Sequence, residues 1–324
     1  MFARVLKGLL CSIAIGLAGT CAVQAQDYPT RPLHIVITYA PGSTTDILAR
    51  VVASRLSPEL GQPALVESQA GGGGLIGARN VLSAQPVGYT LLYGSNAIFG
   101  NLHAYKNPGY KFDDFTALGV TAMAPWALVV PTNLPAKDLK EFVAWVKASP
   151  DKYNYGSIGP SAIPSLLMER LKASTGMSLQ PVLYKGSDPA LLAMLGGEIQ
   201  AYFPTVGTAR TRVVAGQARA LAVGDSKRSE ALPDVPTFKE LGYDNMELMV
   251  WNALFAPSSA PKPVIAKLQS AMAKVTASPE LKAQTGKMSM VSWTDTLEKF
   301  NAHIKAEAAS VGEDFRRLKL PVED

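Results

Sequence analysis

Cysteine is nearly absent from this chain of 324 residues. Its two cysteines, Cys11 and Cys21, both lie within the first 25 residues. A mature chain that begins after them would have no disulfide, no thiolate nucleophile and no cysteine-based metal site. Histidine is also scarce, and no pair among His34, His103 and His303 has the spacing of zinc ligands. We therefore expect neither a metal nor any other cofactor.

An excess of charge of one sign is also missing, because 31 lysines and arginines are nearly balanced by 26 aspartates and glutamates. Without a basic run, we expect no nucleic acid as a partner. Hydrophobic residues make up 48% of the chain, which is enough for large buried cores and argues against disorder. The length exceeds that of most single cores, so we expect two domains.

Long apolar runs are missing as well. The most apolar segment follows the basic residues Arg4 and Lys7 and covers residues 9–23, which is short of the roughly 18–20 residues that cross a bilayer. Val23-Gln24-Ala25 then places small residues at the two positions that a signal peptidase reads. We predict a signal peptide over residues 1–25, cleaved after Ala25, and an exported protein.

Two other fates of this segment agree less well with its sequence. A membrane anchor would need a longer apolar run. Lipidation of Cys21 would need a lipobox, and Thr20 stands where such a motif has a small Gly or Ala.

Hydrophobic periodicity predicts two series of alternating strands and helices. The first series has strands at 33–39, 64–67 and 89–93 and helices at 44–60 and 75–83. The second has strands at 153–155, 180–183, 200–203 and 219–223 and helices at 139–148, 164–175 and 188–195, the last with Asp188 as N-cap. Apolar runs at 126–130 and 249–256 predict two chain crossings, and helices follow at 263–276, 280–287 and 293–317.

The second series is thus inserted into the first. We predict an α/β fold of two domains, each a mostly parallel sheet flanked by helices. Residues 26–130 and 250–324 would form domain 1, and residues 131–249 domain 2. Two domains joined by two crossings can hinge and close a cleft between them.

A glycine-rich segment, residues 71–77, matches the dinucleotide-binding pattern G-x-G-x-x-G. That fingerprint belongs after the first strand and needs a carboxylate about 20 residues later, at the end of the next strand. Here it follows the second strand, and the next strand ends in Gly94-Ser95-Asn96 without an acid. We interpret the glycines as a tight turn into a helix.

Two strand-to-helix loops are candidates for binding an anion. One runs from Tyr39 to Asp46 and the other from Tyr155 to Ser165, and both are rich in small and hydroxyl-bearing residues. The first N–H groups of a helix lack partners, and the helix dipole favours negative charge there. One loop from each domain could therefore hold a carboxylate across the cleft.

Three residues near these loops leave alternatives open. For Asp46 we favour the interpretation that it complements the helix dipole while Ser43 or Thr44 caps the helix. Lys185 could steer an anion or simply be solvated. Trp251, in the second crossing, could face the cleft or the core.

Signs of catalysis are weak. Ser157 follows a glycine, but G-x-S-x-G is not met. Residues 149–152 match S-x-x-K by letters only, because Pro150 breaks the helix that this motif needs. We expect a protein that is not an enzyme, with an exported hydrolase as the weaker alternative.

Several segments occur in a specific order that spans nearly the whole chain after residue 25. They are Y-P-T-R-P-L (28–33), Y-A-P-G-S-T-T-D (39–46), G-G-G-G-L-I-G (71–77), G-Y-T-L-L (88–92), Y-K-G-S (184–187), L-G-G-E (195–198) and L-P-D-V-P-T (232–237). In this order they resemble the Bug family, the solute receptors of tripartite tricarboxylate transporters.

The resemblance implies a type II-like periplasmic binding protein fold, in which a small carboxylate is captured between the domains and delivered to a membrane permease. It also implies a periplasmic location and a monomer. The family's two loops, here 42–46 and 157–165, would hold the carboxylate through backbone N–H groups and hydroxyls. The expected ligand-binding residues are Tyr39, Pro41, Gly42, Ser43, Thr44, Thr45, Asp46, Ser95, Asn96, Ser157, Gly159, Ser161, Ala162, Ser165, Lys185 and Thr205.

The chain departs from the family pattern in both loops. The usual P-G-G is Pro41-Gly42-Ser43 here. In the second loop, Ser161, Ala162 and Ser165 stand where the family often has a glycine, a serine and a histidine. The smaller Ser165 would make room, so we hypothesise an aromatic or amide-bearing acid as ligand. A receptor that feeds a signalling system instead of a permease is the alternative function.

Overall fold

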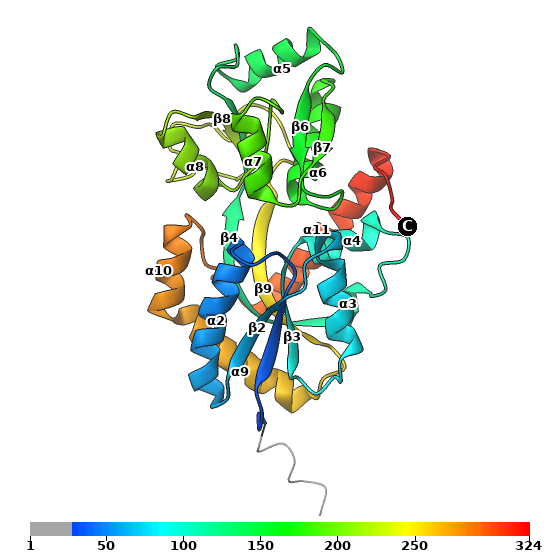
Figure 1. Cartoon of the computed structure of the whole chain (residues 1–324), viewed down its shortest axis with the longest axis vertical. Coiled ribbons are helices and arrows are strands. Elements are labelled where there is room, and N and C mark those ends of the chain that lie inside the picture. The colour runs from blue at the N-terminus through cyan, green and yellow to red at the C-terminus, as the bar shows by residue number, and fades with distance from the viewer. Residues whose placement is uncertain (1–27) are drawn as a thin grey trace, which may run out of the picture.

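The computed structural model describes residues 28–324, so the predicted signal peptide and its cleavage site lie outside the described residues. Figure 1 shows two lobes, one above the other. We call the lobe with the larger sheet the lower lobe and the lobe with two smaller sheets the upper lobe. Every helix in the described part of the chain is too short or too polar to cross a membrane.

The lower lobe contains one five-stranded sheet in the order β2-β1-β3-β9-β4. Its strands are β1 (Leu33–Ile37), β2 (Ala64–Ser68), β3 (Thr90–Ser95), β4 (Phe115–Pro125) and β9 (Met249–Pro257). Its helices are α2 (Thr44–Leu60), α3 (Leu75–Ser83), α4 (Ala97–Ala104), α9 (Lys262–Ala277), α10 (Pro279–Lys287) and α11 (Leu297–Arg317).

This sheet is mixed, whereas the sequence predicted mostly parallel strands. β1 is parallel to β2 and β3, but β9 is antiparallel to both β3 and β4. The reason is the chain path, because β4 leads toward the upper lobe and β9 returns from it (Figure 1). A returning strand that pairs with an outgoing one must run antiparallel to it.

The ends of α2 follow from local sequence. Ser43 has an extended backbone and accepts a hydrogen bond from the Asp46 N–H on its side chain, as an N-cap does. Gly61 adopts a left-handed conformation, with φ of 69°, and ends the helix. The buried face of α2 packs with β1 in one core cluster that includes Leu33, Ile35, Ile37, Leu48, Val52 and Leu56.

The upper lobe contains the strands β5 (Ala127–Pro131), β6 (Asn154–Ser157), β7 (Gln180–Leu183) and β8 (Ala218–Val223). Its helices are α5 (Leu139–Lys147), α6 (Ile163–Thr175), α7 (Ser187–Leu195) and α8 (Val206–Val214). β5 pairs antiparallel with β8, and β6 pairs parallel with β7. The strand predicted at 200–203 is wrong, because Ala201 and Tyr202 form only isolated bridges to Tyr155 and Val129.

Two chain segments cross between the lobes, at Trp126 between β4 and β5 and at the start of β9. A link that the sequence did not predict comes from α11. Its Phe300 and Ile304 belong to a core cluster of the lower lobe, whereas its Val311 and Phe315 belong to the main core cluster of the upper lobe. The domain limits at 130/131 and 249/250 stay a proposal; the first of them falls within β5, which lies in the upper lobe.

The glycine-rich segment forms a short 3-10 turn that leads into α3. Gly71, Gly72, Gly73 and Gly74 have φ of 140°, 55°, 60° and 100°. Side chains other than glycine rarely adopt such values, so the run of glycines is explained by backbone geometry.

Three other differences concern helices. α7 begins at Ser187 after Gly186, so Asp188 lies in its first turn and is not the N-cap. α4 was not predicted, because most of its residues are buried and the sequence shows no polar face. α8 was not predicted either, although Thr205 stands at its N-cap position and is a residue type favoured there.

Candidate functional site

The loop before α2 is held in shape by Asp46. Its carboxylate accepts a hydrogen bond from the Gly42 N–H at 2.8 Å and forms an ion pair with Arg50 at 2.9 Å. Burial opposes the charged form, but the Arg50 guanidinium and the hydrogen bond from the Gly42 N–H outweigh it and hold the pKa of Asp46 below its usual value. Asp46 therefore organises this loop, and of the two caps that the sequence offered, Ser43 is the one observed.

The first two N–H groups of α2, those of Thr44 and Thr45, have no backbone acceptor among residues 28–324. Thr44 and Thr45 donate no backbone hydrogen bond to any residue of the described part of the chain. Thr44 is exposed, while the buried Thr45 donates its hydroxyl to Asn252 at 3.2 Å. Beside them, a β-carbon added at Gly42 would meet nothing within 4 Å. The start of α2 thus has two N–H groups without an internal acceptor in the described chain.

Tyr39 and Ser95 lie together at the ends of adjacent strands. Their hydroxyl oxygens are 3.3 Å apart, and burial raises the pKa of Tyr39 despite this hydrogen bond. Asn96 is buried and donates its side-chain amide to the Met249 carbonyl at 2.7 Å, so it supports the second crossing. Pro41 is exposed in the loop before α2.

The loop between β6 and α6 carries a buried hydroxyl pair. The Ser157 and Ser165 hydroxyls are 2.8 Å apart, and Ser157 also accepts a hydrogen bond from the Gly159 N–H at 3.3 Å. Ala162 is buried at the N-cap position of α6 and has no side chain able to cap it. The two serines line a pocket of about 360 Å³, whose other walls include Tyr155, Pro160, Pro181, Leu183, Leu318, Leu320 and Pro321.

Ser161, in the same loop, contacts the lower lobe. Its hydroxyl donates to the Asn101 side-chain oxygen on α4 at 2.6 Å, and both residues are buried. Asn101 in turn donates its amide to the Gly72 and Gly73 carbonyls at 3.2 Å. The structure therefore places Ser161 in a contact between the lobes.

A pocket of about 280 Å³ is lined by residues of both lobes. Thr44 comes from the start of α2, and Thr205, Gly207 and Thr208 come from the start of α8. The other lining residues are Asp188, Leu191, Thr211, Arg212, Met288 and Met290. The structure thus brings the predicted residues Thr44 and Thr205 together, and it adds the N-terminus of α8, which the sequence reasoning missed.

Besides Asp46, the sequence left the positions of Lys185 and Trp251 open, and the structure gives these two residues different surroundings. Lys185 is exposed in the connection between β7 and α7. Trp251 is 0% exposed and packs against Phe99, Phe255 and Phe300, so it faces the core and not the cleft.

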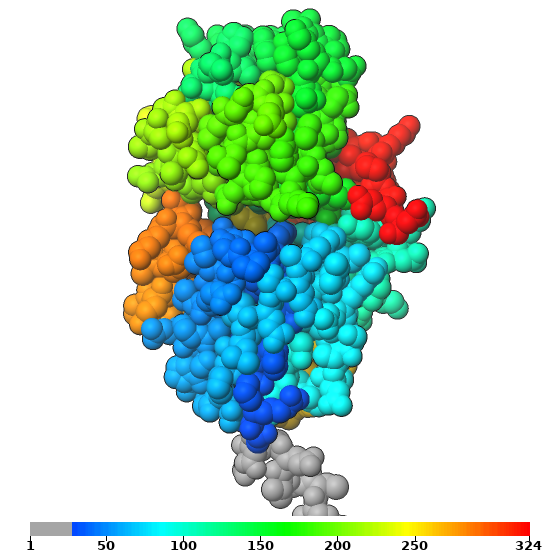
Figure 2. Space-filling model, viewed as in Figure 1, coloured from blue at the N-terminus to red at the C-terminus, as the bar shows by residue number. Residues whose placement is uncertain are grey.

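No group of three His, Asp or Glu side chains in residues 28–324 is placed to hold a metal ion. What the structure offers instead is a pair of α/β lobes, linked by two crossings, with a hollow between them (Figure 2). The N-termini of α2 and α8 meet at that boundary from opposite lobes. This fold defines the class of periplasmic binding proteins, and the solved structures compared below share it.

The family follows from sequence comparison. The family model described as "Tripartite tricarboxylate transporter family receptor" matches residues 48–318, and the chain belongs to this family. Membership places it among binding receptors and not among enzymes.

Individual relatives are consistent with this family assignment. A UPF0065 protein of Bordetella pertussis is 34% identical over 83% of this chain and 84% of its own length. The periplasmic binding protein BugD has a TM-score of 0.83 at 30% identity and covers 91% of this chain and 100% of its own.

Two further solved structures carry ligands. Rpa4515 of R. palustris with adipate has a TM-score of 0.83 at 28% identity, over 91% of this chain and 100% of its own. MatC of Rhodopseudomonas palustris with bound malate has a TM-score of 0.81 at 25% identity, over 89% of this chain and 99% of its own.

Proposed function

We propose that this chain captures a small carboxylate in the cleft between its lobes. We further propose that it acts in the periplasm as a monomer and delivers the acid to the permease of a tripartite tricarboxylate transporter. The observation that supports the ligand class most directly is the pocket lined by Thr44 at the start of α2 and by Thr205, Gly207 and Thr208 at the start of α8. The relatives with adipate and malate are consistent with it.

The physical basis is the supply of unpaired donors. Two helix N-termini, one from each lobe, line one pocket. In the described part of the chain, the first N–H groups of both helices have no backbone acceptor, and both dipoles have their positive ends there. Hydrogen bonds from such donors to a carboxylate are strengthened when water is excluded. Because each lobe supplies part of the site, the ligand can favour the state in which the lobes are together.

The pocket at Ser157 and Ser165 shares no lining residue with the pocket at Thr44, so it is a second candidate position for the acid. Its volume of about 360 Å³ lies within the range of pockets that hold small ligands. Its wall combines leucine, proline and Tyr155 with the charged residues Glu169, Lys319 and Glu323, so it offers contacts to an apolar body as well as to polar groups. We therefore keep aromatic and amide-bearing acids as candidate ligands beside short dicarboxylates.

Thr44 allows the proposal to be tested with a single donor removed. It is the first residue of α2, where proline is tolerated, and the preceding Ser43 already has the extended backbone that proline requires. We expect Thr44→Pro to weaken acid binding about tenfold or more without lowering the melting temperature. Thr44→Ala, which keeps the N–H and removes only the hydroxyl, should lose less.

The measurement is isothermal titration calorimetry of the purified mature chain with adipate, malate, benzoate, phenylacetate and hippurate, the last of which is both aromatic and amide-bearing. Binding of at least one acid that Thr44→Pro weakens selectively supports the proposal. If no acid in the panel binds, or if Thr44→Pro binds as tightly as the unaltered chain, the start of α2 does not hold a carboxylate.

A further inference from the structure

Two glycines stand inside helices although their backbone does not require glycine. Gly207 lies in the first turn of α8 and Gly100 lies in α4, and neither has φ in the left-handed region. Glycine in a helix costs about 1 kcal/mol relative to alanine. Local helix stability therefore does not explain either residue.

Both glycines lie against the opposite lobe. A β-carbon added at Gly207 would be 2.0 Å from the carbonyl oxygen of Met288, which follows α10 in the lower lobe. A β-carbon added at Gly100 would be 3.0 Å from the carbonyl oxygen of Ser161, which belongs to the upper lobe. A carbon–oxygen distance of 2.0 Å is far inside van der Waals contact, so the lobes could not meet this way with alanine at 207.

The two contacts lie at opposite ends of the boundary between the lobes. In Figure 1, α8 and α10 lie on one side of the molecule, and α4 and α6 on the other. At the α4 end the approach is secured by the hydrogen bond from Ser161 to Asn101, the neighbour of Gly100. At the other end, Gly207 and Met288 line the pocket that also contains Thr44 and Thr205.

We propose that Gly207 and Gly100 are positioning residues that allow the lobes to close on the ligand. The inference rests on the proposed function for the ligand, but the contacts themselves are a property of the two lobes. Alanine at either position should favour its own helix while it keeps the lobes apart. Gly207→Ala should have the larger effect, because a shift of a few tenths of an ångström would relieve the contact at Gly100.

A cross-linking experiment tests this without any ligand. The chain after residue 25 contains no cysteine, so Asn101→Cys and Ser161→Cys would place a single reactive pair across the boundary. The rate of disulfide formation under mild oxidation then reports how often the lobes meet at that end. We expect Gly207→Ala, at the other end, to slow this rate about tenfold or more, with no loss of helix by circular dichroism.

Gly286→Ala is the matched control, because Gly286 is also helical and a β-carbon there would meet nothing within 4 Å. Equal cross-linking rates in the Gly207→Ala and Gly286→Ala backgrounds would overturn the proposal. Calorimetry with adipate on the cysteine-free chains gives a second readout, in which Gly207→Ala should bind about tenfold more weakly. If adipate and the other acids fail to bind the unaltered chain, the proposed ligand class is wrong, while the cross-linking rates still decide the role of the glycines.

Discussion

The residues around the start of α2 have two roles: Asp46 fixes the loop, and Thr44 and Thr45 offer N–H groups that are unpaired within the described chain. Asp46 commits its carboxylate to Gly42 and Arg50, and thereby leaves the N–H groups of Thr44 and Thr45 without an internal acceptor. A carboxylate beside a candidate anion site looks unfavourable, but this one is paired with a guanidinium. Its charge is partly neutralised, and its role is to fix the loop that presents the donors.

The pairing of Asp46 predicts a pH dependence of stability. Its pKa is lowered in the folded state, so it stabilises the fold above its unfolded pKa of about 4, and this contribution is lost as pH falls through the folded pKa. We expect Asp46→Asn to lower the free energy of unfolding by about 1 kcal/mol at pH 7. Urea denaturation from pH 7 to pH 3 should show the two proteins converging at the acidic end. A difference that is constant over this range would contradict an ionised Asp46 as the source.

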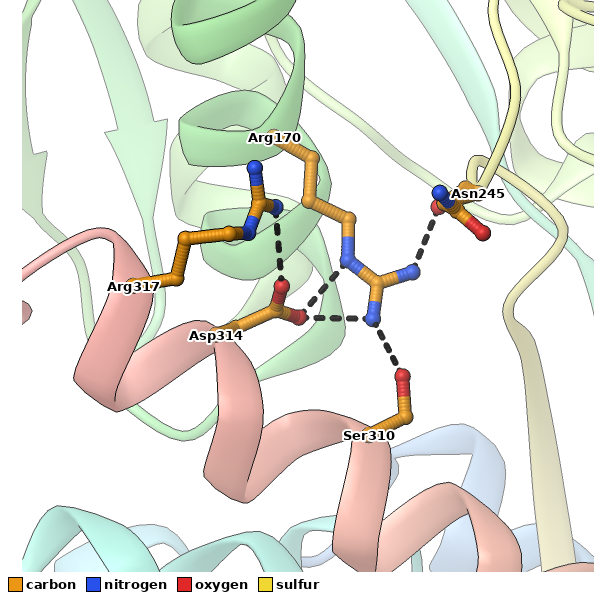
Figure 3. Close-up of polar contacts among 5 residues, drawn as sticks. All are labelled: Arg170, Asn245, Ser310, Asp314 and Arg317. Atoms are coloured by element: carbon orange, nitrogen blue, oxygen red, sulfur yellow. Dashed lines mark hydrogen bonds and ion pairs between the residues drawn. The ribbon is translucent and has the colours of Figure 1, made fainter.

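At the scale of elements, helices α6 and α11 are joined by a buried ion pair (Figure 3). Arg170 donates from Nε to the Asp314 carboxylate at 2.7 Å, and from Nη2 it contacts the same oxygen at 2.6 Å and the Ser310 hydroxyl at 3.0 Å. Arg317 contacts the other oxygen of Asp314 at 3.3 Å. The side chains of Arg170 and Asp314 are each 6% exposed, so this cluster connects the lobes in a region with little water.

Removing one partner of this pair should be costly, because it leaves a buried charge without its partner. We expect Arg170→Leu to lower the free energy of unfolding by about 3–5 kcal/mol, measured by urea denaturation. The double variant Arg170→Leu with Asp314→Leu should recover much of that loss, since both charges are gone. Losses that simply add in the double variant would show that the two side chains are not coupled.

At the scale of the whole molecule, helix α11 joins the hydrophobic cores of the two lobes. Its N-terminal half packs with Trp251 and Phe255 of the lower lobe, and its C-terminal half packs with upper-lobe residues such as Leu166. The two cores are therefore not independent, and unfolding of one removes part of the other.

We therefore expect differential scanning calorimetry to show a single cooperative transition for the chain from residue 26 onward. An acid at a free concentration of about 100 times its dissociation constant should raise the free energy of unfolding by about 2.7 kcal/mol. Phe315→Ala, which weakens the contact of α11 with the upper lobe, should broaden or split the peak. Two separate transitions in the unaltered chain would show that α11 does not couple the lobes.

The elements that the sequence predicted well are those with a strong local pattern. The limits of α2, 44–60, and of α3, 75–83, agree with the structure, because capping residues and apolar spacing define them within a few neighbours. α4 lacks such a pattern, since it is buried on most sides. The direction of β9 depends on pairing with strands more than a hundred residues earlier.

The candidate site divides in the same way. The sequence pointed to Thr44 through the residues of one loop, and to Thr205 through resemblance to a family. It did not show that Thr44 and Thr205 line one pocket or that Ser161 contacts Asn101, because these residues are far apart in the chain. Trp251 could be assigned to the core only when its neighbours were known.

By itself, then, the sequence determined the α/β class and the family, and it predicted two loops as anion sites, because these depend on local composition and spacing. Only the tertiary structure decided which helix N-termini share a pocket, which glycines lie between the lobes and how α11 joins the two cores. Those features are contacts between distant segments, and their geometry is fixed only when the whole chain packs.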